Sequence, residues 1–361
     1  MGPIYPGIPG LRPYFSRERQ GARLSNFGRK AEEDILESTV SAGLTVGFIG
    51  LGDMGGAIAG SLVRNGVDLV AFDLRPEPVA RLVAQGARAA ESLAALAEAS
   101  DVAFVVVVDD KQVNDVAGRL FAHPGRLQTI IISSTVLPST VIALGEKAKR
   151  QGLHVIDAPV SGGAEKASRG IITIMVGGED EPVRRCWPVF EAFGKHIFHV
   201  GPAGAGSAGK LVNNLLSLGG NILQLEAMQL AHAYGISEDS VTEFVAVSAG
   251  DSRALHTWGR IDRVRRSHTI GGTPEMYEMF SKDVKTATLA AGERGVTLPV
   301  AAVIGATTAE KMRVRDKFLE ANAMTGAIPR CTICGQELAS SYRAAAVHPE
   351  CAYDPESASG R

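Results

Sequence analysis

The sequence predicts an α/β fold, a Rossmann-type doubly wound parallel sheet, followed by an all-α C-terminal domain. Short apolar runs rich in Val and Ile alternate with helical patterns over residues 44–203, as in a series of βαβ units. A glycine-rich turn joins the first run to the first helix. The last strand-like run lies at 196–200, and helical patterns follow it. We therefore expect two domains, 44–203 and 204–325, between an N-terminal arm at 1–43 and a tail at 326–361.

Composition limits the classes of protein that the chain can belong to. Its 361 residues are enough for two domains with sizeable cores, and 45% of them are hydrophobic. A net charge of −2 argues against a nucleic-acid or membrane-surface partner. No apolar run reaches the roughly 18 residues that span a bilayer. Four cysteines do not indicate a disulfide scaffold, and we expect a cytoplasmic protein.

The first 30 residues of the arm at 1–43 are basic, and Glu18 is the only acid among them. It lacks the apolar centre that a secretory signal peptide requires. We expect a flexible extension or a short helix over 31–38, and a transit peptide is the alternative.

The first strand, expected at 44–50, leads into the pattern G-x-G-x-x-G and then a helix. Gly50 allows the tight turn, Gly52 allows a pyrophosphate to approach the backbone, and Gly55 allows the helix to pack closely on the strand. The start of the helix adds N–H groups that favour phosphate. The pattern predicts dinucleotide binding, and the alternative is a glycine-rich packing turn.

The second strand, expected at 67–73, ends in Asp73, which stands 23 positions after Gly50. An acid at this spacing bonds the adenosine ribose and repels a 2′-phosphate, so it favours NAD over NADP. Arg75, two residues further on, keeps NADP as the alternative.

Further strands are expected at 102–108, 129–133, 153–157, 171–178 and 196–200. Ser134 and Thr135 follow the strand at 129–133, at the edge where doubly wound sheets bind ligands. They either line the nicotinamide site or cap the next helix.

The turn after the strand at 153–157 contains Ser161, Gly162 and Gly163. Its exposed backbone N–H groups suit a carboxylate, and the alternative is an ordinary strand-to-helix loop. This turn is our candidate for binding a small carboxylic acid.

Lys210 opens an apolar helix that is expected to end near Tyr234. It shares one helix face with other polar side chains, namely Asn214, Ser217, Asn221 and Gln224. Burial makes the charged form of a lysine costly, so a lysine in this setting suits acid/base work near neutral pH. The alternative is a solvated helix face.

Four motifs together resemble the β-hydroxyacid dehydrogenase family, and they occur in the order found in that family. They are Gly-Phe-Ile-Gly-Leu-Gly-Asp-Met-Gly at 47–55, Asp-Ala-Pro-Val-Ser-Gly-Gly at 157–163, Gly-Lys-Leu-Val-Asn-Asn at 209–214 and Ser-Lys-Asp-Val at 281–284. The resemblance covers about residues 44–320. It implies a Rossmann domain, a long helix and an all-α domain, usually in a homodimer or homotetramer.

The resemblance also implies reversible NAD(P)-linked oxidation of the 3-hydroxyl of a small acid. Lys210 would be the general acid/base, and Asn214 would hold the substrate or position the lysine. Ser161, Gly162 and Gly163 would bind the carboxylate. The expected cofactor-binding residues are Gly50, Leu51, Gly52, Asp53, Met54, Gly55, Asp73, Leu74, Arg75, Val107, Val108, Gln112, Thr135 and Lys282. The family often has Leu-Pro after its fourth strand, where this chain has Val107 and Val108 followed by two aspartates.

Two other functions stay open. Imine reductases share the fold, but those relatives usually lack the lysine. A non-catalytic nucleotide-binding scaffold would use the tail for contact with a partner.

The tail carries Cys331, Cys334, His348 and Cys351 within 21 residues. A Cys-x-x-Cys pair followed by a second close pair suits a structural, tetrahedral zinc site. The alternative is a disordered tail with reduced thiols.

Overall fold

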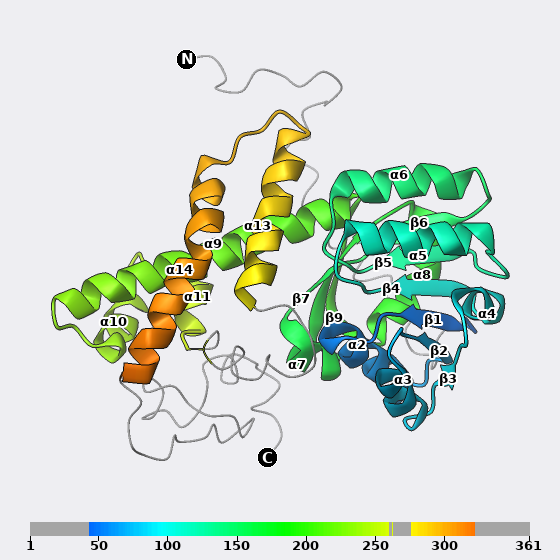
Figure 1. Cartoon of the computed structure of the whole chain (residues 1–361), viewed down its shortest axis with the longest axis horizontal. Coiled ribbons are helices and arrows are strands. Elements are labelled where there is room, and N and C mark those ends of the chain that lie inside the picture. The colour runs from blue at the N-terminus through cyan, green and yellow to red at the C-terminus, as the bar shows by residue number, and fades with distance from the viewer. Residues whose placement is uncertain (1–42, 260–261, 263–275, 322–361) are drawn as a thin grey trace, which may run out of the picture. The chain divides into compact units, whose positions relative to one another are not determined.

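The computed structural model describes residues 43–259, 262 and 276–321. Strands and helices alternate over the first part of this chain (Figure 1). The strands are β1 Val46–Ile49, β2 Leu69–Phe72, β3 Arg88–Ala89, β4 Val102–Val105, β5 Thr129–Ile132, β6 His154–Asp157, β7 Val160–Ser161, β8 Ile172–Gly177 and β9 Gly194–Gly201. The helices between them are α2 Asp53–Arg64, α3 Pro76–Val83, α4 Leu93–Ala99, α5 Asp110–Ala122, α6 Pro138–Lys149, α7 Gly163–Ser168 and α8 Asp180–Glu191.

The first six strands form a parallel sheet in the order β3-β2-β1-β4-β5-β6. The chain moves outward from β1 in one direction to β3 and then in the other direction to β6. Ligands of such sheets bind outside the carboxyl ends of the strands at the point where the direction changes, here between β1 and β4. The predicted doubly wound fold is therefore confirmed.

The remaining strands make a mixed edge that the sequence did not predict. β8 runs antiparallel to β6 and β7, while β9 runs parallel to β8. To run parallel to β6, β8 would need a crossover connection of a dozen or more residues that returns the chain to the end of the sheet where β6 begins. The only helix between β6 and β8 is α7, and its six residues are too few for that return.

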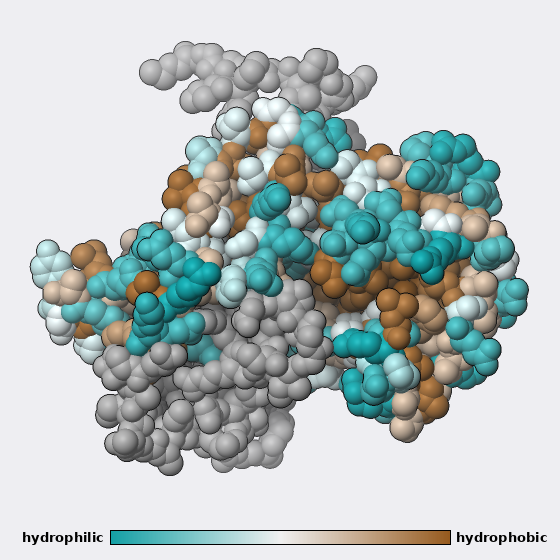
Figure 2. Space-filling view, viewed as in Figure 1, coloured by the Kyte–Doolittle hydropathy of each residue, from teal (hydrophilic) through white to brown (hydrophobic). Residues whose placement is uncertain are grey.

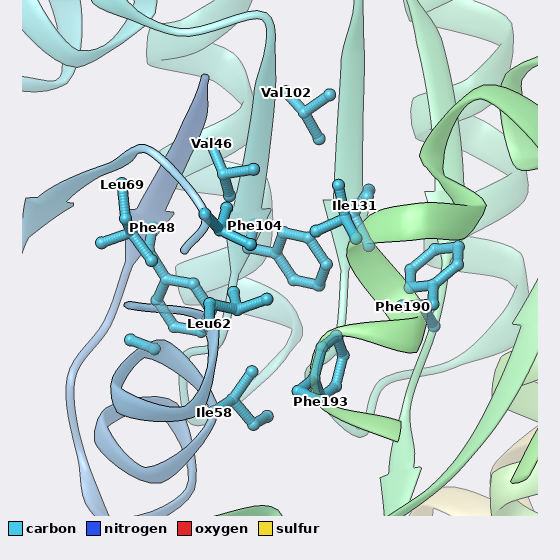
Figure 3. Close-up of a cluster of buried hydrophobic side chains, with 14 of the residues drawn as sticks. Val46, Phe48, Ile58, Leu62, Leu69, Val102, Phe104, Ile131, Phe190 and Phe193 are labelled. Atoms are coloured by element: carbon cyan, nitrogen blue, oxygen red, sulfur yellow. The ribbon is translucent and has the colours of Figure 1, made fainter. Parts of the chain in front are cut away.

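Each face of the sheet has its own apolar core, because successive residues of a strand point to opposite faces. Val46 and Phe48 of β1 pack with α2 and α8, whereas Ile49 packs with α4, α5 and α6. In the first core the rings of Phe48 and Phe104 stack at 5.6 Å, and Phe193 meets Phe104 edge-on at 5.9 Å (Figure 3). Burial on both faces explains why these strands are continuously apolar.

Helices form the second part of the described chain. They are α9 Ala205–Ala233, α10 Glu238–Val245, α11 Arg253–His256, α13 Met276–Gly292 and α14 Pro299–Ala321. The long helix α9 packs against β8 and β9 near its start and against α13 and α14 further along (Figure 1). It therefore connects the sheet to the helical region.

A buried arginine joins three parts of the helical region. The guanidinium of Arg315 on α14 pairs with the carboxylates of Glu238 and Asp262. Trp258 donates from its indole Nε1 to Oε2 of Glu238 at 2.7 Å, and its ring lies 4.7 Å from the guanidinium. Because burying an unpaired charge is costly, this cluster keeps its members together.

The start of α9 differs from the prediction, because the helix begins at Ala205 and not at Lys210. The buried carboxylate of Asp157, at the end of β6, accepts from the backbone N–H groups of Gly204 at 2.9 Å and Ser207 at 2.6 Å. It therefore satisfies donors that a helix start leaves without partners. Burial raises the pKa of Asp157 although these hydrogen bonds act in the opposite direction.

Several predictions lie outside the described residues. These include the arm up to residue 42 and the tail with Cys331, Cys334, His348 and Cys351. Over the residues that the structure describes, no group of three or more His, Cys, Asp or Glu side chains is placed to hold a metal ion. No helix in this part of the chain is long and apolar enough to cross a membrane.

Candidate active site

The glycine turn between β1 and α2 has the shape that a bound dinucleotide requires. Gly50 has a φ of +91°, and a Cβ at that position would collide with the carbonyl oxygen of Val106. A Cβ at Gly55 would collide with the carbonyl oxygen of Gly50. A Cβ at Gly52 would meet nothing within 4 Å, so the backbone there is open to a ligand. The turn therefore fits a pyrophosphate beside the N-terminus of α2.

Asp73 stands directly after β2, next to this turn. The backbone N–H of Leu51 donates to Oδ2 of Asp73 at 2.6 Å, and that of Arg75 donates to Oδ1 at 2.9 Å. The Arg75 side chain adds an ion pair at 3.3 Å. Burial alone would raise the pKa of Asp73, but these hydrogen bonds outweigh it and lower the pKa. Asp73 is therefore a carboxylate at neutral pH, beside Leu51 of the glycine turn.

The loops after β4 and β5 are held together by side chains. The backbone N–H of Val107 donates to Oγ of Ser134 at 2.8 Å, and that of Val108 donates to Oε1 of Gln112 at 3.0 Å. Nζ of Lys282, from α13, donates to the carbonyl oxygens of Val108 at 3.1 Å and Thr135 at 3.3 Å. Residues from three separate segments, all expected to touch the cofactor, are thereby brought together.

Neither Ser134 nor Thr135 is the N-cap residue of helix α6. Its N-cap residue is Leu137, whose side chain makes no capping bond. Oδ1 of Asp110 instead accepts from the backbone N–H of Leu137 at 2.9 Å and from the hydroxyl of Thr140 at 2.6 Å. The hydroxyl of Ser134 holds the β4 loop, so the capping interpretation is wrong.

Lys210 lies in the second turn of α9 and is half-buried. Burial lowers its pKa to about 8, and the charge of Lys282 acts in the same direction. The carboxylate of Asp283 opposes both effects. A lysine with this pKa exchanges its proton near physiological pH.

The turn at Ser161, Gly162 and Gly163 is in contact with the first third of α9. Nδ2 of Asn213 is 3.1 Å from Oγ of Ser161, and Nδ2 of Asn214 donates to Oδ2 of Asp283 at 2.7 Å. Gly162 and Gly163 have φ values of +146° and +84°. Such values favour glycine and turn the backbone sharply between β7 and α7. The motifs at 157–163, 209–214 and 281–284 therefore meet around α9.

The polar side chains expected on one face of α9 differ in how deeply they are buried. Asn214 and Gln224 are buried, whereas Ser217 is exposed and Asn221 lies between. The part of this face that is near the candidate site is therefore its first three turns, which include Lys210 and Asn214.

Sequence reasoning missed Asp157, Asn213 and Asp283. Asp157 could have been found as an acid that ends an apolar strand two residues before a proline. Asp283 stands beside Lys282, and Asn213 stands beside Asn214 in the motif at 209–214. Their contacts depend on side-chain positions that no sequence pattern shows.

The fold and this set of residues define a class: oxidoreductases that bind a nicotinamide dinucleotide on a Rossmann sheet and carry a lysine on the helix that follows it. A family model described as the NAD binding domain of 6-phosphogluconate dehydrogenase matches residues 45–201. A second, described as the NAD-binding of NADP-dependent 3-hydroxyisobutyrate dehydrogenase, matches residues 204–325.

Similar proteins support the same class. The 2-(hydroxymethyl)glutarate dehydrogenase of Eubacterium barkeri is 37% identical over 266 residues, which make up 72% of this chain and 86% of that protein. The NAD-dependent L-serine dehydrogenase of Pseudomonas aeruginosa is 35% identical over 264 residues, with coverages of 71% and 88%. Mycobacterium tuberculosis 3-hydroxyisobutyrate dehydrogenase, solved with L-serine, is 27% identical and matches with a TM-score of 0.65 over 78% of this chain and 95% of that chain.

The chain therefore belongs to the β-hydroxyacid dehydrogenase family and is an NAD(P)-dependent hydroxyacid dehydrogenase. The four motifs at 47–55, 157–163, 209–214 and 281–284 had predicted this family, and that prediction is confirmed.

Proposed function

We propose that this protein catalyses the reversible, NAD-dependent oxidation of the 3-hydroxyl of a small 3-hydroxy acid, with Lys210 as the general acid/base. The observation that carries the proposal is the half-buried Lys210 ammonium with its pKa lowered to about 8. It lies on the same helix as Asn214, close to Asp283 and Lys282. A lysine that only solvated a helix face would keep a pKa near 10.4.

Lys210 acts on the proton of the substrate hydroxyl. In the oxidation direction its neutral amine accepts this proton, and in the reduction direction its ammonium returns the proton to the carbonyl oxygen. When bound, the nicotinamide ring takes up or supplies the hydride. Asn214 donates one amide hydrogen to Asp283 and keeps the other for the substrate oxygen. Lys210 and Asn214 therefore act on the same oxygen atom.

The turn at Ser161, Gly162 and Gly163 binds the substrate carboxylate. The hydroxyl of Ser161 and the backbone N–H groups of the two glycines are donors, which an anion requires. Asn213 links this turn to α9, which carries the lysine. A short acid that is held at its carboxylate would then present its 3-hydroxyl to α9.

The cofactor in this proposal is NAD, with NADP as the alternative. Asp73 is a carboxylate beside the glycine turn, where it would bond the ribose hydroxyls and repel a 2′-phosphate. Arg75, the residue that would favour NADP, is paired with Asp73. Titration of the protein with NADH and NADPH tests this, and tighter binding of NADPH would contradict it.

The decisive experiment follows NADH absorbance with a panel of 3-hydroxy acids. The panel contains 3-hydroxypropionate and the acids named in similar dehydrogenases, which are 3-hydroxyisobutyrate, L-serine, L-threonate and 2-(hydroxymethyl)glutarate. We expect reduction of NAD by at least one of them. Binding of NADH without turnover of any acid would favour the scaffold, and NADPH-dependent reduction of a cyclic imine would favour an imine reductase.

Three further features belong to this proposal. The domain boundaries are 1–43, 44–203, 204–325 and 326–361, and the protein is a cytoplasmic homodimer or homotetramer. Support for assembly comes from exposed apolar side chains on α9, which include Leu216, Leu223 and Leu230 at intervals of seven residues.

The tail is proposed to bind one structural zinc ion through Cys331, Cys334, His348 and Cys351. The support is the spacing of these four residues in the sequence. Protein purified without chelator should contain about one zinc per chain, and zinc near zero would end this part of the proposal.

A further inference from the structure

The amide of Asn213 lies between the two halves of the proposed substrate site. Asn213 follows Lys210 by three residues on α9 and is half-buried. Its Nδ2 is 3.1 Å from Oγ of Ser161, on β7, and 3.3 Å from Oδ1 of Asn214. One NH₂ group thus contacts both the carboxylate-binding turn and the residue beside the reacting oxygen.

The direction of these hydrogen bonds is set by Asp283. Its carboxylate pairs with Nζ of Lys282 at 3.2 Å and can only accept. Asn214 must therefore turn its NH₂ group toward Asp283, at 2.7 Å, and its carbonyl oxygen toward Asn213. Two carbonyl oxygens cannot bond each other, so Asn213 must present its NH₂ group to Asn214.

The same logic decides which way the hydroxyl of Ser161 points. The second hydrogen of the Asn213 NH₂ group is donated to Oγ of Ser161. A hydroxyl has one hydrogen and two lone pairs, so Ser161 accepts this bond and keeps its own hydrogen for another partner. The hydroxyl of Ser161 makes no other hydrogen bond with the residues that the structure describes.

We propose that Asn213 is a positioning residue that forces the Ser161 hydroxyl to act as a hydrogen-bond donor toward the substrate carboxylate. This inference rests on the proposed function. The negative charge of Asp283 orients Asn214, Asn214 orients Asn213, and Asn213 orients the hydroxyl of Ser161. The charge of Asp283, on α13, thereby makes the turn at Ser161 specific for anions.

While Lys210 is an ammonium, the resulting site offers only donors to the substrate. Ser161 offers its O–H, Asn214 offers its remaining amide hydrogen, and Lys210 offers its ammonium before it loses a proton. A carboxylate only accepts, so it matches the Ser161 end of this set. A carboxamide of the same shape places either a weaker acceptor or an NH₂ group there, and two facing donors cannot bond.

A double-mutant cycle between Asn213 and Ser161 tests the inference by binding alone. The probe is 3-hydroxypropionate, added to NADH-loaded protein, where the reduced cofactor prevents turnover, and Kd is measured by calorimetry. Asn213→Ala should weaken binding by about 3- to 10-fold, the effect of one lost hydrogen bond. In the Ser161→Ala background the same change should have less than about a twofold effect, because the hydroxyl that it orients is gone.

A second readout separates positioning from general damage to the site. Wild-type protein should prefer 3-hydroxypropionate over 3-hydroxypropionamide, and Asn213→Ala should reduce that preference. A merely structural role for Asn213 would weaken the acid and the amide equally. Asn213→Ser, which is small and can still donate, should restore part of the preference.

The matched control is Asn221→Ala, on the same helix. The Asn221 amide donates to the backbone oxygen of Ser217 at 2.6 Å and bonds to no other element in the described part of the chain. This variant should keep wild-type affinity for both probes. Each variant must also keep the wild-type NADH affinity and melting temperature, and Asn213→Leu, which is of similar size and cannot donate, replaces Asn213→Ala if the alanine variant does not fold.

The outcomes distinguish this inference from the proposed function. Additive effects in the cycle, or an unchanged preference for acid over amide, would overturn the role of Asn213 even if the enzyme is active. If wild-type protein binds 3-hydroxypropionate too weakly to measure, the best substrate of the acid panel replaces it. Absence of both binding and turnover with every acid would overturn the proposed function and this inference with it.

Discussion

The α/β region and the helical region bury their apolar side chains to different degrees. Between residues 44 and 203 the structure shows six exposed large apolar side chains, whereas the shorter described part from 204 to 321 has thirteen. Figure 2 shows apolar surface over α13 and α14, and Val300 and Val303 of α14 are among the exposed residues. Monomeric proteins rarely expose large contiguous apolar patches, so the helical region is the part expected to meet another subunit.

The α/β region and the helical region are suited to different tasks. The sheet closes one core on each face and carries the glycine turn and Asp73, which are the features that a dinucleotide requires. The helical region carries Lys210, Asn213 and Asn214 on a helix that is packed on both the sheet and α13. Binding of the pyrophosphate and ribose should therefore depend on the first region, whereas turnover and assembly should depend on the second, which also supplies Lys282 to the loops after β4 and β5.

The largest effect is expected from Lys210→Ala. It removes the proposed acid/base group, so turnover of the best acid should fall at least about 100-fold. NADH affinity, measured by fluorescence titration, should stay within about twofold because no phosphate or ribose contact is assigned to Lys210. Near-normal turnover would remove Lys210 from the mechanism, and a parallel loss of NADH binding would break the division between the two regions.

The next effect concerns the glycine turn, where Gly50 and Gly52, separated by one residue, give a matched pair. Gly52→Ala places a methyl group in open space, so the melting temperature should stay unchanged while NADH binds about 10- to 100-fold more weakly. Gly50→Ala forces a positive φ on alanine and a collision with Val106, so it should also destabilise the fold by about 1–3 kcal/mol. Thermal unfolding and fluorescence titration measure both. Unchanged NADH affinity in Gly52→Ala would contradict phosphate binding at this turn.

A smaller effect is expected on assembly. Leu216 and Leu223 are 75% and 67% exposed on one face of α9, so glutamates there should not disturb the fold. Burying each leucine in an interface would contribute about 1.5–3 kcal/mol. The double variant Leu216→Glu/Leu223→Glu should therefore shift an oligomer toward monomer, as measured by light scattering.

The control for assembly comes from the other region. Phe198→Glu on β9 also replaces an exposed apolar side chain, which is 53% exposed, and should leave the mass unchanged. Wild-type protein that is monomeric at micromolar concentration would show the proposed assembly to be wrong.

Sequence reasoning succeeded where the determinants are local. The glycine turn follows from three glycines within six residues, and five of the first six strands follow from apolar runs. The exception is β3, the exposed pair Arg88–Ala89, which has no apolar run and was not predicted. The start of α9 was misjudged because the carboxylate that caps it, Asp157, lies 47 residues before Gly204. The antiparallel β8 was missed because an apolar run carries no information on strand direction.

The candidate site shows the same limit. Lys210 could be identified from its place on an apolar helix, because an isolated lysine there is unusual. The contact between Asn214 and Asp283 spans 69 residues and depends on how α13 crosses α9. The bond between Asn213 and Ser161 likewise depends on the packing of α9 against β7, which no motif describes.

The smallest predicted effect is the pH dependence, and it links the helical region to the chemistry most directly. With a pKa of about 8, Lys210 is mostly ammonium below pH 8 and mostly neutral above it. The oxidation rate should therefore rise as pH increases through about 8, and the reduction rate should fall over the same range. Profiles of kcat/KM in the two directions measure this.

Two charge variants test whether Lys210 is the group that titrates, because they should shift its pKa in opposite directions. Asp283 raises the pKa of Lys210 and Lys282 lowers it. Asp283→Asn should therefore move the midpoint of the oxidation profile to lower pH, and Lys282→Met should move it to higher pH, each by less than about one unit. Both variants will also reduce activity, but a lost contact alone changes the height of a profile and not its midpoint. Midpoints that stay in place in both variants would show that another group titrates in the reaction.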